Sequence, residues 1–225
     1  MKHNHIFAAL AGSIAVCTAL TGCASAAPDV NAEQTAAAAA TITLNGGSAS
    51  VQGKGAAVQG TVITISDAGT YRITGTLDDG QIVIDAGKDD AVTLVLDNAD
   101  ISCSNSAGIY AKQAGTTTLL LQDGTQNSVS DAAQYAYPDG GDEPDAAIFA
   151  KDDLTIAGSG TLTVTGSFNN AIGSKDNLLI ESGTLIVTAA NDGLRGRDSV
   201  TITDGNFTID AQGDGIKSNN DEDAE

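Results

Sequence analysis

The chain has 225 residues, of which 29 are acidic and only 10 are Lys or Arg, so its formal net charge at pH 7 is −19. Such an acidic surface repels nucleic acid and anionic lipid headgroups, which argues against both as partners. The length suffices for one elongated domain, and a content of 26 Gly, 3 Pro and no Trp fits short strands and frequent turns.

The amino terminus has the pattern of a secretory signal. Lys2 precedes an apolar run over residues 6–20, which is too short for a comfortable membrane span, and the run ends in Leu-Thr-Gly-Cys. This resembles the bacterial lipobox, in which the signal peptide (residues 1–22) is removed and Cys23 carries lipid. The alternative is a soluble secreted protein cut after Ala24 or Ala26. Either predicts export, and the first predicts a lipid-anchored protein at the bacterial cell surface.

Residues 23–40 have no strand pattern and predict a flexible tether. The following segments alternate apolar and polar residues between turn signals, which predicts strands. We expect residues 41–90 to cap a stack of coils and residues 130–147 to form a projecting loop. The predicted strands cover residues 41–46, 61–66, 71–77, 81–87, 91–103, 106–112 and 116–124.

Residues 148–225 repeat at a period of about 22 residues, and each copy has apolar residues at alternating positions. Self-similarity at this period indicates a solenoid whose coils bury their apolar faces only by stacking. The sequence therefore predicts an all-β, right-handed parallel β-helix, with a β-sandwich as the alternative. Five apolar columns align: Ile148, Ile172, Leu194, Ile216; Leu154, Leu178, Val200; Ile156, Ile180, Ile202; Leu162, Leu185, Phe207; and Val164, Val187, Ile209.

Acidic residues recur in step with these columns. Stacked carboxylates about 4.8 Å apart repel one another, and a shared dication would turn this repulsion into cohesion. Several carboxylate oxygens in irregular coordination are what Ca²⁺ prefers. The alternative is that Asp and Asn only form turns. The candidate calcium ligands are Asp152, Asp176, Asp198 and Asn220 in one column, Asn170, Asp192 and Asp214 in another, and Asp221.

A basic column lies beside the acidic ones. Lys151, Lys175 and Arg197 align directly before the aspartates, and Arg195 and Lys217 lie two positions earlier in their coils. These residues could compensate the neighbouring carboxylates. The other interpretation is a strip that contacts uronate carboxylates, and this makes the five residues our candidates for substrate binding.

Several stretches also resemble the bacterial carbohydrate-binding β-helix proteins, among them AAIFAKDDLTIAGSGTLTV, NDGLRGRDSVTITDGNFTIDA and GDGIKSNNDEDA. The resemblance implies a fold like that of pectate lyases and calcium-dependent binding of plant cell-wall polysaccharide, cellulose and polygalacturonate in particular. Family chains usually continue through further coils after the last motif, so we expect either a fragment or an uncapped final coil.

These observations predict a monomeric, non-catalytic surface protein that binds an acidic glycan with Ca²⁺ and meets the membrane only through its lipid. One alternative is a calcium-dependent lyase that uses Lys175, Arg195 or Arg197 as the base. Another is a structural or adhesin role. Among the aromatic residues we expect Tyr135 and Tyr137 in a loop, and Tyr110, Phe149 and Phe207 in core or turn packing.

Overall fold

The computed structural model describes residues 38–137 and 140–220, and these residues form strands and no helix. A sheet of twelve strands follows the order β18-β15-β12-β9-β7-β10-β13-β16-β19, with β5, β1 and β2 attached. Its bounds are β1 (Ala40–Gly46), β2 (Ala49–Gly53), β5 (Gly69–Leu77), β7 (Ala91–Ser102), β9 (Thr116–Leu121), β10 (Gln126–Ser130), β12 (Asp153–Gly158), β13 (Thr161–Gly166), β15 (Asn177–Ile180), β16 (Thr184–Ala189), β18 (Ser199–Ile202) and β19 (Asn206–Ala211).

A second sheet of eight strands follows the order β20-β17-β14-β11-β8-β6-β4-β3. Its bounds are β3 (Ala56–Gln59), β4 (Val62–Ile65), β6 (Gln81–Asp85), β8 (Ile109–Gln113), β11 (Ala146–Ala150), β14 (Asn170–Ser174), β17 (Leu194–Gly196) and β20 (Ile216–Ser218).

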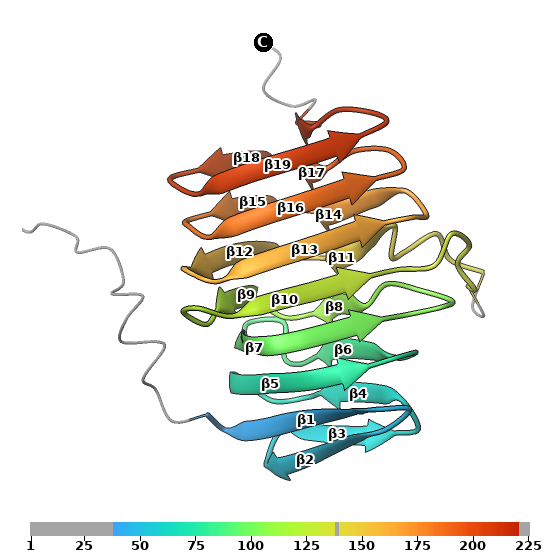
Figure 1. Cartoon of the computed structure of the whole chain (residues 1–225), viewed down its shortest axis with the longest axis vertical. Helices are drawn as coiled ribbons and strands as arrows, with labels where there is room; N and C mark the ends of the chain where they lie inside the picture. Colours follow the sequence, from blue (N-terminus) through green and yellow to red (C-terminus); the bar gives the residue numbers. More distant parts are fainter. Residues whose placement is uncertain (1–37, 138–139, 221–225) are drawn as a thin grey trace, which may run out of the picture.

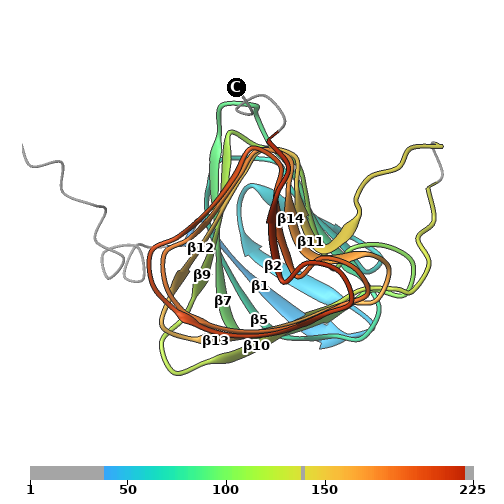
Figure 2. The same cartoon turned by 90° about the horizontal axis from the view of Figure 1, so that it is seen from above.

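The strands are stacked as successive coils, each of which pairs in parallel with the next (Figure 1). Along the chain, β11, β12 and β13 make one coil and β14, β15 and β16 the next. Seen along the stack, three walls enclose the interior (Figure 2). The eight-stranded sheet forms one wall. The twelve-stranded sheet forms the other two, which meet at the long strand β7 because β7 pairs with both β9 and β10.

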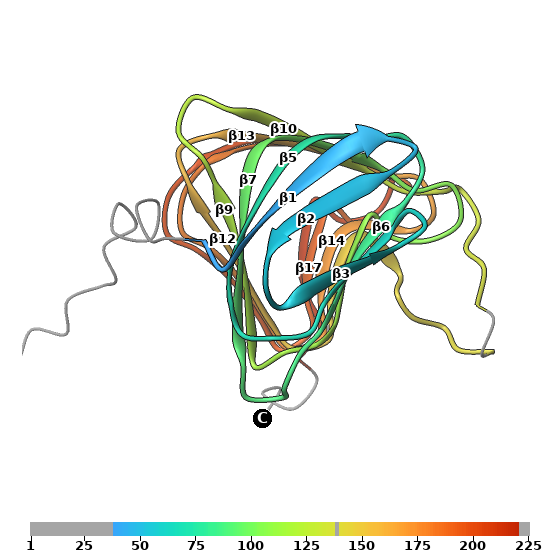
Figure 3. The same cartoon turned by 90° about the horizontal axis from the view of Figure 1, so that it is seen from below.

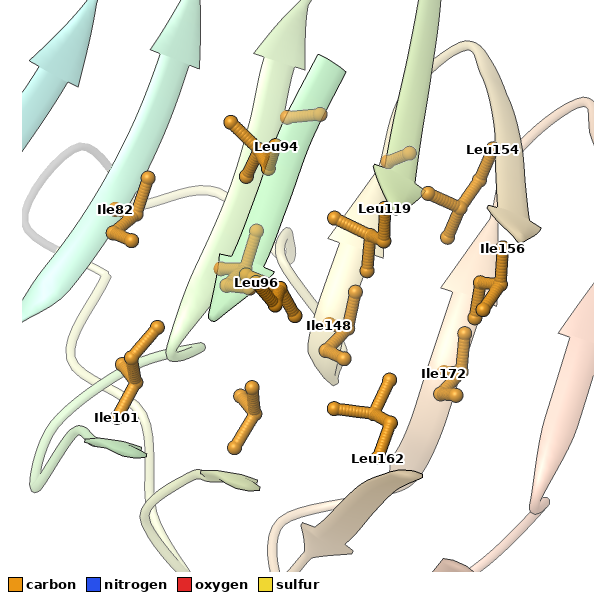
Figure 4. Packing of buried hydrophobic residues seen from close by; sticks show 14 of the residues in the cluster. Ile82, Leu94, Leu96, Ile101, Leu119, Ile148, Leu154, Ile156, Leu162 and Ile172 are labelled. Atoms are coloured by element: carbon orange, nitrogen blue, oxygen red, sulfur yellow. The ribbon is translucent and has the colours of Figure 1, made fainter. Parts of the chain in front are cut away.

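The pairing register aligns all five apolar columns that the sequence predicted. Buried members of four columns, among them Ile148, Leu154, Ile156 and Leu162, pack inside the walls (Figure 4). Ile148, Ile172 and Leu194 are at most 1% exposed, whereas Ile216 in the last described coil is 47% exposed. Complete burial of one such side chain contributes roughly 1.5–3 kcal/mol. Stacking is therefore what makes each coil stable.

Some corners of the coils require glycine. Gly158 ends β12 with φ +99°, and a Cβ on it would lie 2.2 Å from the carbonyl oxygen of Leu121 in the coil before. Only a residue without a side chain tolerates this conformation and approach. This corner therefore requires glycine at position 158.

The amino-terminal cap is smaller than the sequence predicted. Among the described strands, antiparallel pairing is limited to β1 with β2 and β3 with β4, and these hairpins cover the end of the stack (Figure 3). Parallel pairing already begins with β5 and β6, so residues 69–90 belong to the coils. β1 starts at Ala40, one residue inside the predicted tether. The sequence missed β2, β3 and β10, whose short segments are rich in Gln, Ser and Ala and lack a run of large apolar residues.

The predicted loop is present between β10, which ends at Ser130, and β11, which starts at Ala146. It leaves the stack beside the eight-stranded sheet (Figure 2). Within the described residues, no helical segment could cross a bilayer. The predicted signal peptide, Cys23, most of the tether and Asp221 lie outside the described residues.

Candidate functional site

The outer face of the eight-stranded sheet carries one aligned column of outward side chains. Strand residues alternate between the two faces, so the residue after each buried apolar position points outward. The neighbouring pairs in this column are in register along the whole sheet. In chain order the column contains Val83, Tyr110, Phe149, Gly173, Arg195 and Lys217.

The predicted basic column lies beside it. The amide of Lys151 donates to the carbonyl of Ala111, that of Lys175 to Ala150 and that of Arg197 to Ser174, with distances of 2.9, 3.0 and 3.0 Å. Each of these basic residues thus lies directly after a strand of the eight-stranded sheet (β11, β14 or β17), at an equivalent position of successive coils. Together with Arg195 and Lys217, these residues form what we call the basic strip.

Carboxylates of the inserted loop compensate this strip. Glu143 forms ion pairs with Lys151, at 3.3 Å, and with Lys175. Asp145 pairs with Arg195 at 3.3 Å. The sequence suggested compensation by the adjacent aspartate columns, but the loop provides it for these three bases. Sequence reasoning missed both loop residues, because a loop inserted between coils has no repeat partner that would give its register.

The two loop carboxyls differ in pKa. Burial alone would raise the pKa of Glu143, but the hydrogen bonds from Lys175 and Lys151 outweigh it and hold this pKa below its ordinary value. For Asp145, burial raises the pKa and Arg195 opposes this only in part. Asp145 also accepts hydrogen bonds from Asn169 and Asn170, at 3.4 and 3.3 Å. The loop is therefore tied to the sheet mainly by charge at Glu143 and by a buried polar network at Asp145.

Two pockets lie on this face, and Glu143 lines both. The smaller, of about 140 Å³, includes Phe149, Gly173, Lys175, Arg195 and Arg197. Phe149 points outward, yet only 5% of it is exposed. A Cβ on Gly173 would lie 3.3 Å from the ring of Phe149, so this glycine leaves space for the ring. Three carboxylates, of Asp142, Glu143 and Asp145, face the three cationic groups in the smaller pocket.

The larger pocket has a volume of about 680 Å³ and lies toward the amino-terminal coils. Val83, Tyr110 and Lys112 of β6 and β8 line it, and Tyr137, Glu143 and Pro144 of the loop line its other side. The rings of Tyr110 and Phe149 have centroids 5.9 Å apart, which links the two pockets. The expectation that Tyr110 packs in the core was wrong, since its half-buried side chain lies on the outer face.

Aromatic residues also fix the start of the loop. Tyr135 stacks on Phe168 with ring centroids 4.3 Å apart, and its hydroxyl donates to Asp131 at 2.5 Å. The hydroxyl of Tyr137 donates to the carbonyl of Pro144 at 2.8 Å. Tyr135 and Tyr137 are in the loop as predicted, but they anchor it and do not form an exposed binding row. Phe207 packs against the core, as expected.

One predicted acidic column forms a hydrogen-bonded ladder. The amide of Asp192 donates to Oδ1 of Asn170 at 3.2 Å, and the amide of Asp214 donates to Oδ1 of Asp192 at 3.0 Å. Asp192 is only 2% exposed, and its Oδ2 lies 3.2 Å from Nζ of Lys217, which also pairs with Asp214. These oxygens thus satisfy the backbone of the next coil, as turn-forming Asx side chains do.

The other acidic column remains a cluster of like charges. The amide of Asp198 donates to the carbonyl of Asp176 at 3.0 Å, so the two residues occupy equivalent places in adjacent coils. Burial raises the pKa of Asp176, and Asp198 and Asp152 raise it further. Asp152 accepts from the amide of Ala114 at 3.3 Å, and Asn220 is exposed at the far end.

This cluster fits a cation only in part. Among residues 38–137 and 140–220, no three Asp, Glu, His or Cys side chains lie close enough together to hold a metal by themselves. The raised pKa of Asp176 nevertheless shows repulsion that a cation would relieve. A bound cation would need further oxygen ligands from the backbone, water or another molecule.

Comparison with known proteins places the chain in a family. Residues 59–225 match the family described as "Carbohydrate-binding domain-containing protein". A protein of that description from Acetivibrio thermocellus is 41% identical over 183 residues, which are 80% of this chain and 64% of the relative. The chain therefore belongs to the carbohydrate-binding domain family and spans less than two thirds of this relative's length.

A solved structure is also similar. The polysaccharide lyase-like protein from C. thermocellum, studied as a gadolinium derivative, shares 40% identity with a TM-score of 0.80. The match covers 81% of this chain and 75% of that one.

Proposed function

We propose that this protein binds an acidic plant cell-wall polysaccharide, such as polygalacturonate, along the outer face of the eight-stranded sheet. We also propose that its coils form a right-handed parallel β-helix. The observation that carries the proposal is the basic strip, in which cationic groups recur at the same position of successive coils. Such a strip suits a polymer with regularly spaced carboxylates, because each coil offers one further contact. Family membership supports a carbohydrate as the ligand.

Pull-down and calorimetric titration with polygalacturonate test the proposal. Replacement of both Arg195 and Arg197 by Gln removes two of the cations that line the smaller pocket. We expect this double variant to bind at least about ten-fold more weakly, since each lost charge-assisted contact is worth roughly 1–2 kcal/mol. Lys54→Gln is the control, because Lys54 is exposed in the amino-terminal cap. Unchanged binding by the double variant would reject the basic strip as the site.

Calcium is part of the same proposal. A Ca²⁺ ion would bind at the column of Asp152, Asp176 and Asp198 and supply positive charge beside the strip. The like charges around Asp176 support this, and the glycan's own carboxylates could complete a ligand set that the protein alone does not fill. In support, the solved relative was prepared with gadolinium, a hard cation.

We further propose that binding is not followed by cleavage. A lyase needs a group that can accept the proton next to the uronate carboxyl. Lys175 and Arg195, two of the three candidate bases, are both engaged in ion pairs with loop carboxylates. Release of unsaturated sugar ends from polygalacturonate in the presence of Ca²⁺ would contradict this assignment and favour the lyase that the relative's name suggests.

The place of action follows from the amino-terminal sequence. We propose that the protein is exported as a monomer and anchored at the bacterial cell surface through lipid on Cys23, with no nucleic-acid partner. In cell fractionation, Cys23→Ala should release the protein from the membrane fraction. Persistence of this variant in the membrane fraction would contradict the lipid anchor.

A further inference from the structure

We infer that the larger pocket binds an uncharged pyranose unit of the glycan, next to the charged units held by the basic strip. This inference rests on the proposed function, because it assigns a second kind of subsite on the same face. The ligand would then be a mixed polymer. Its units with free carboxylates would alternate with, or lie close to, units that are esterified or otherwise neutral.

The dimensions of the pocket favour a sugar unit. Its volume of about 680 Å³ lies within the range of small-molecule sites, roughly 300–1,000 Å³. The described residues that line it include two phenol rings, of Tyr110 and Tyr137, and the apolar side chains of Val83 and Pro144. A pyranose has apolar C–H faces and a rim of hydroxyl groups. Rings and aliphatic groups can cover such faces while polar groups meet the rim.

The polar groups of the pocket are held in place before any ligand binds. Nε2 of Gln81 donates to the carbonyl of Ala107 at 2.7 Å and to Oγ of Ser106 at 3.1 Å. The hydroxyl of Tyr110 is neutral near pH 7 and can donate, and burial, followed by the charge of Glu143, raises its pKa further. Fixed donors and acceptors reduce the ordering cost of binding.

The charges of the pocket argue for an uncharged ligand. Two charged residues line it, and both are compensated: Lys112 pairs with Asp85 at 2.9 Å, and Glu143 pairs with Lys151 and Lys175. A uronate carboxylate entering here would approach Glu143 without gaining a cation of its own. A neutral sugar avoids this cost.

The pocket is continuous with the proposed glycan face. Glu143 lines both pockets, and the rings of Tyr110 and Phe149 lie side by side between them. Tyr110 and Phe149 belong to neighbouring coils, as Phe149 and Gly173 do. A polymer that follows the column would therefore present consecutive units to the two pockets.

The test uses oligogalacturonates of one length, either free or fully methyl-esterified, in calorimetric titrations. We expect Tyr110→Ala to weaken binding of the esterified oligomer about three- to ten-fold, as for loss of one aromatic contact, and to change binding of the free oligomer less than about two-fold. The double Arg195 and Arg197 variant should bind the free oligomer more weakly and should change binding of the esterified oligomer little. Val83→Lys, which fills the pocket from its outward strand position, should weaken binding of the esterified oligomer without disturbing the core.

The outcomes separate the two hypotheses. If the wild type binds the free oligomer and not the esterified one, the neutral subsite is wrong and the proposed function stands. If it binds neither, the proposed function is wrong. If it binds both, but Tyr110→Ala and Val83→Lys leave the esterified oligomer unaffected while both variants melt like the wild type, the neutral subsite lies elsewhere and the inference is overturned.

Discussion

Glu143 of the inserted loop forms an ion pair with Lys175, which lies 32 residues later in the chain. The loop carboxylate thus occupies a cation that the proposed ligand would also use. If uronate binds as proposed, it would compete with Glu143 for the charge of Lys175.

Glu143→Gln should therefore strengthen binding of polygalacturonate. The gain should be at most about five-fold, because a partly exposed ion pair is worth roughly 0–1 kcal/mol. Asp210→Asn, at an exposed position of β19 outside the pocket, is the control for a general reduction of negative charge. Calorimetric titration decides, and weaker binding by Glu143→Gln would show that the loop supports the site and does not compete with it.

The acidic column predicts a pH dependence of stability. The pKa of Asp176 is raised by burial and by Asp198 and Asp152, so the folded protein holds this proton more tightly than the unfolded chain does. Its contribution to stability therefore falls as the pH rises from the ordinary Asp range through the raised pKa. In EDTA, Asp176→Asn should melt like the wild type at the acidic end and at a higher temperature than the wild type above this window.

The exposed Asp210 of β19 supplies the control for this comparison, as Asp210→Asn. Equal melting temperatures of wild type and Asp176→Asn across the whole pH range would mean that burial and repulsion of the Asp176 carboxylate do not affect the stability of the fold.

Bound Ca²⁺ should offset the destabilisation that the charged Asp176 causes in the wild type. If the column binds Ca²⁺ with a Kd near 1 mM, then 10 mM Ca²⁺ stabilises the wild type by about 1.4 kcal/mol. Asp176→Asn should lose most of this gain, and Asp210→Asn should keep it. Thermal melting at several Ca²⁺ and Mg²⁺ concentrations measures the effect, and a wild type that does not respond to Ca²⁺ would remove calcium from the proposal.

The core makes a prediction that is independent of ligand. Ile172 is fully buried in the first apolar column, so Ile172→Ala should cost about 2–5 kcal/mol of unfolding free energy. Ile186 lies on the outside of β16 and is 41% exposed, so Ile186→Ala should change it by less than about 0.5 kcal/mol. Chemical denaturation of both variants tests the inward and outward assignment, and equal losses would contradict it.

The coils could be predicted from the sequence because residues that repeat at a fixed period determine how neighbouring coils align. Ile148, Ile172 and Leu194 align in sequence and in space, since a repeat has the same geometry in each coil. The partners of the basic strip were not predictable in this way. Glu143 and Asp145 lie in a segment that occurs once, and their contacts depend on how the loop folds back.

Residue type and alignment alone also do not give the contacts of the aromatic and acidic residues. Tyr110 follows a buried isoleucine and so points outward, but its type alone suggested the core. Asn170 and Asp192 align as the sequence indicated, and the structure adds that each accepts a hydrogen bond from the backbone of the next coil. Alignment shows that side chains recur at one position, whereas the structure shows which atoms they contact.

The long strand β7 has a consequence for how the molecule opens. It pairs with β5, β9 and β10, and so joins two walls through one continuous backbone. Its amides should be among the slowest to exchange with deuterium, because their release requires both walls to separate at once. The eight-stranded sheet is not joined to β7 by strand pairing, so we expect its amides to exchange faster than those of β7.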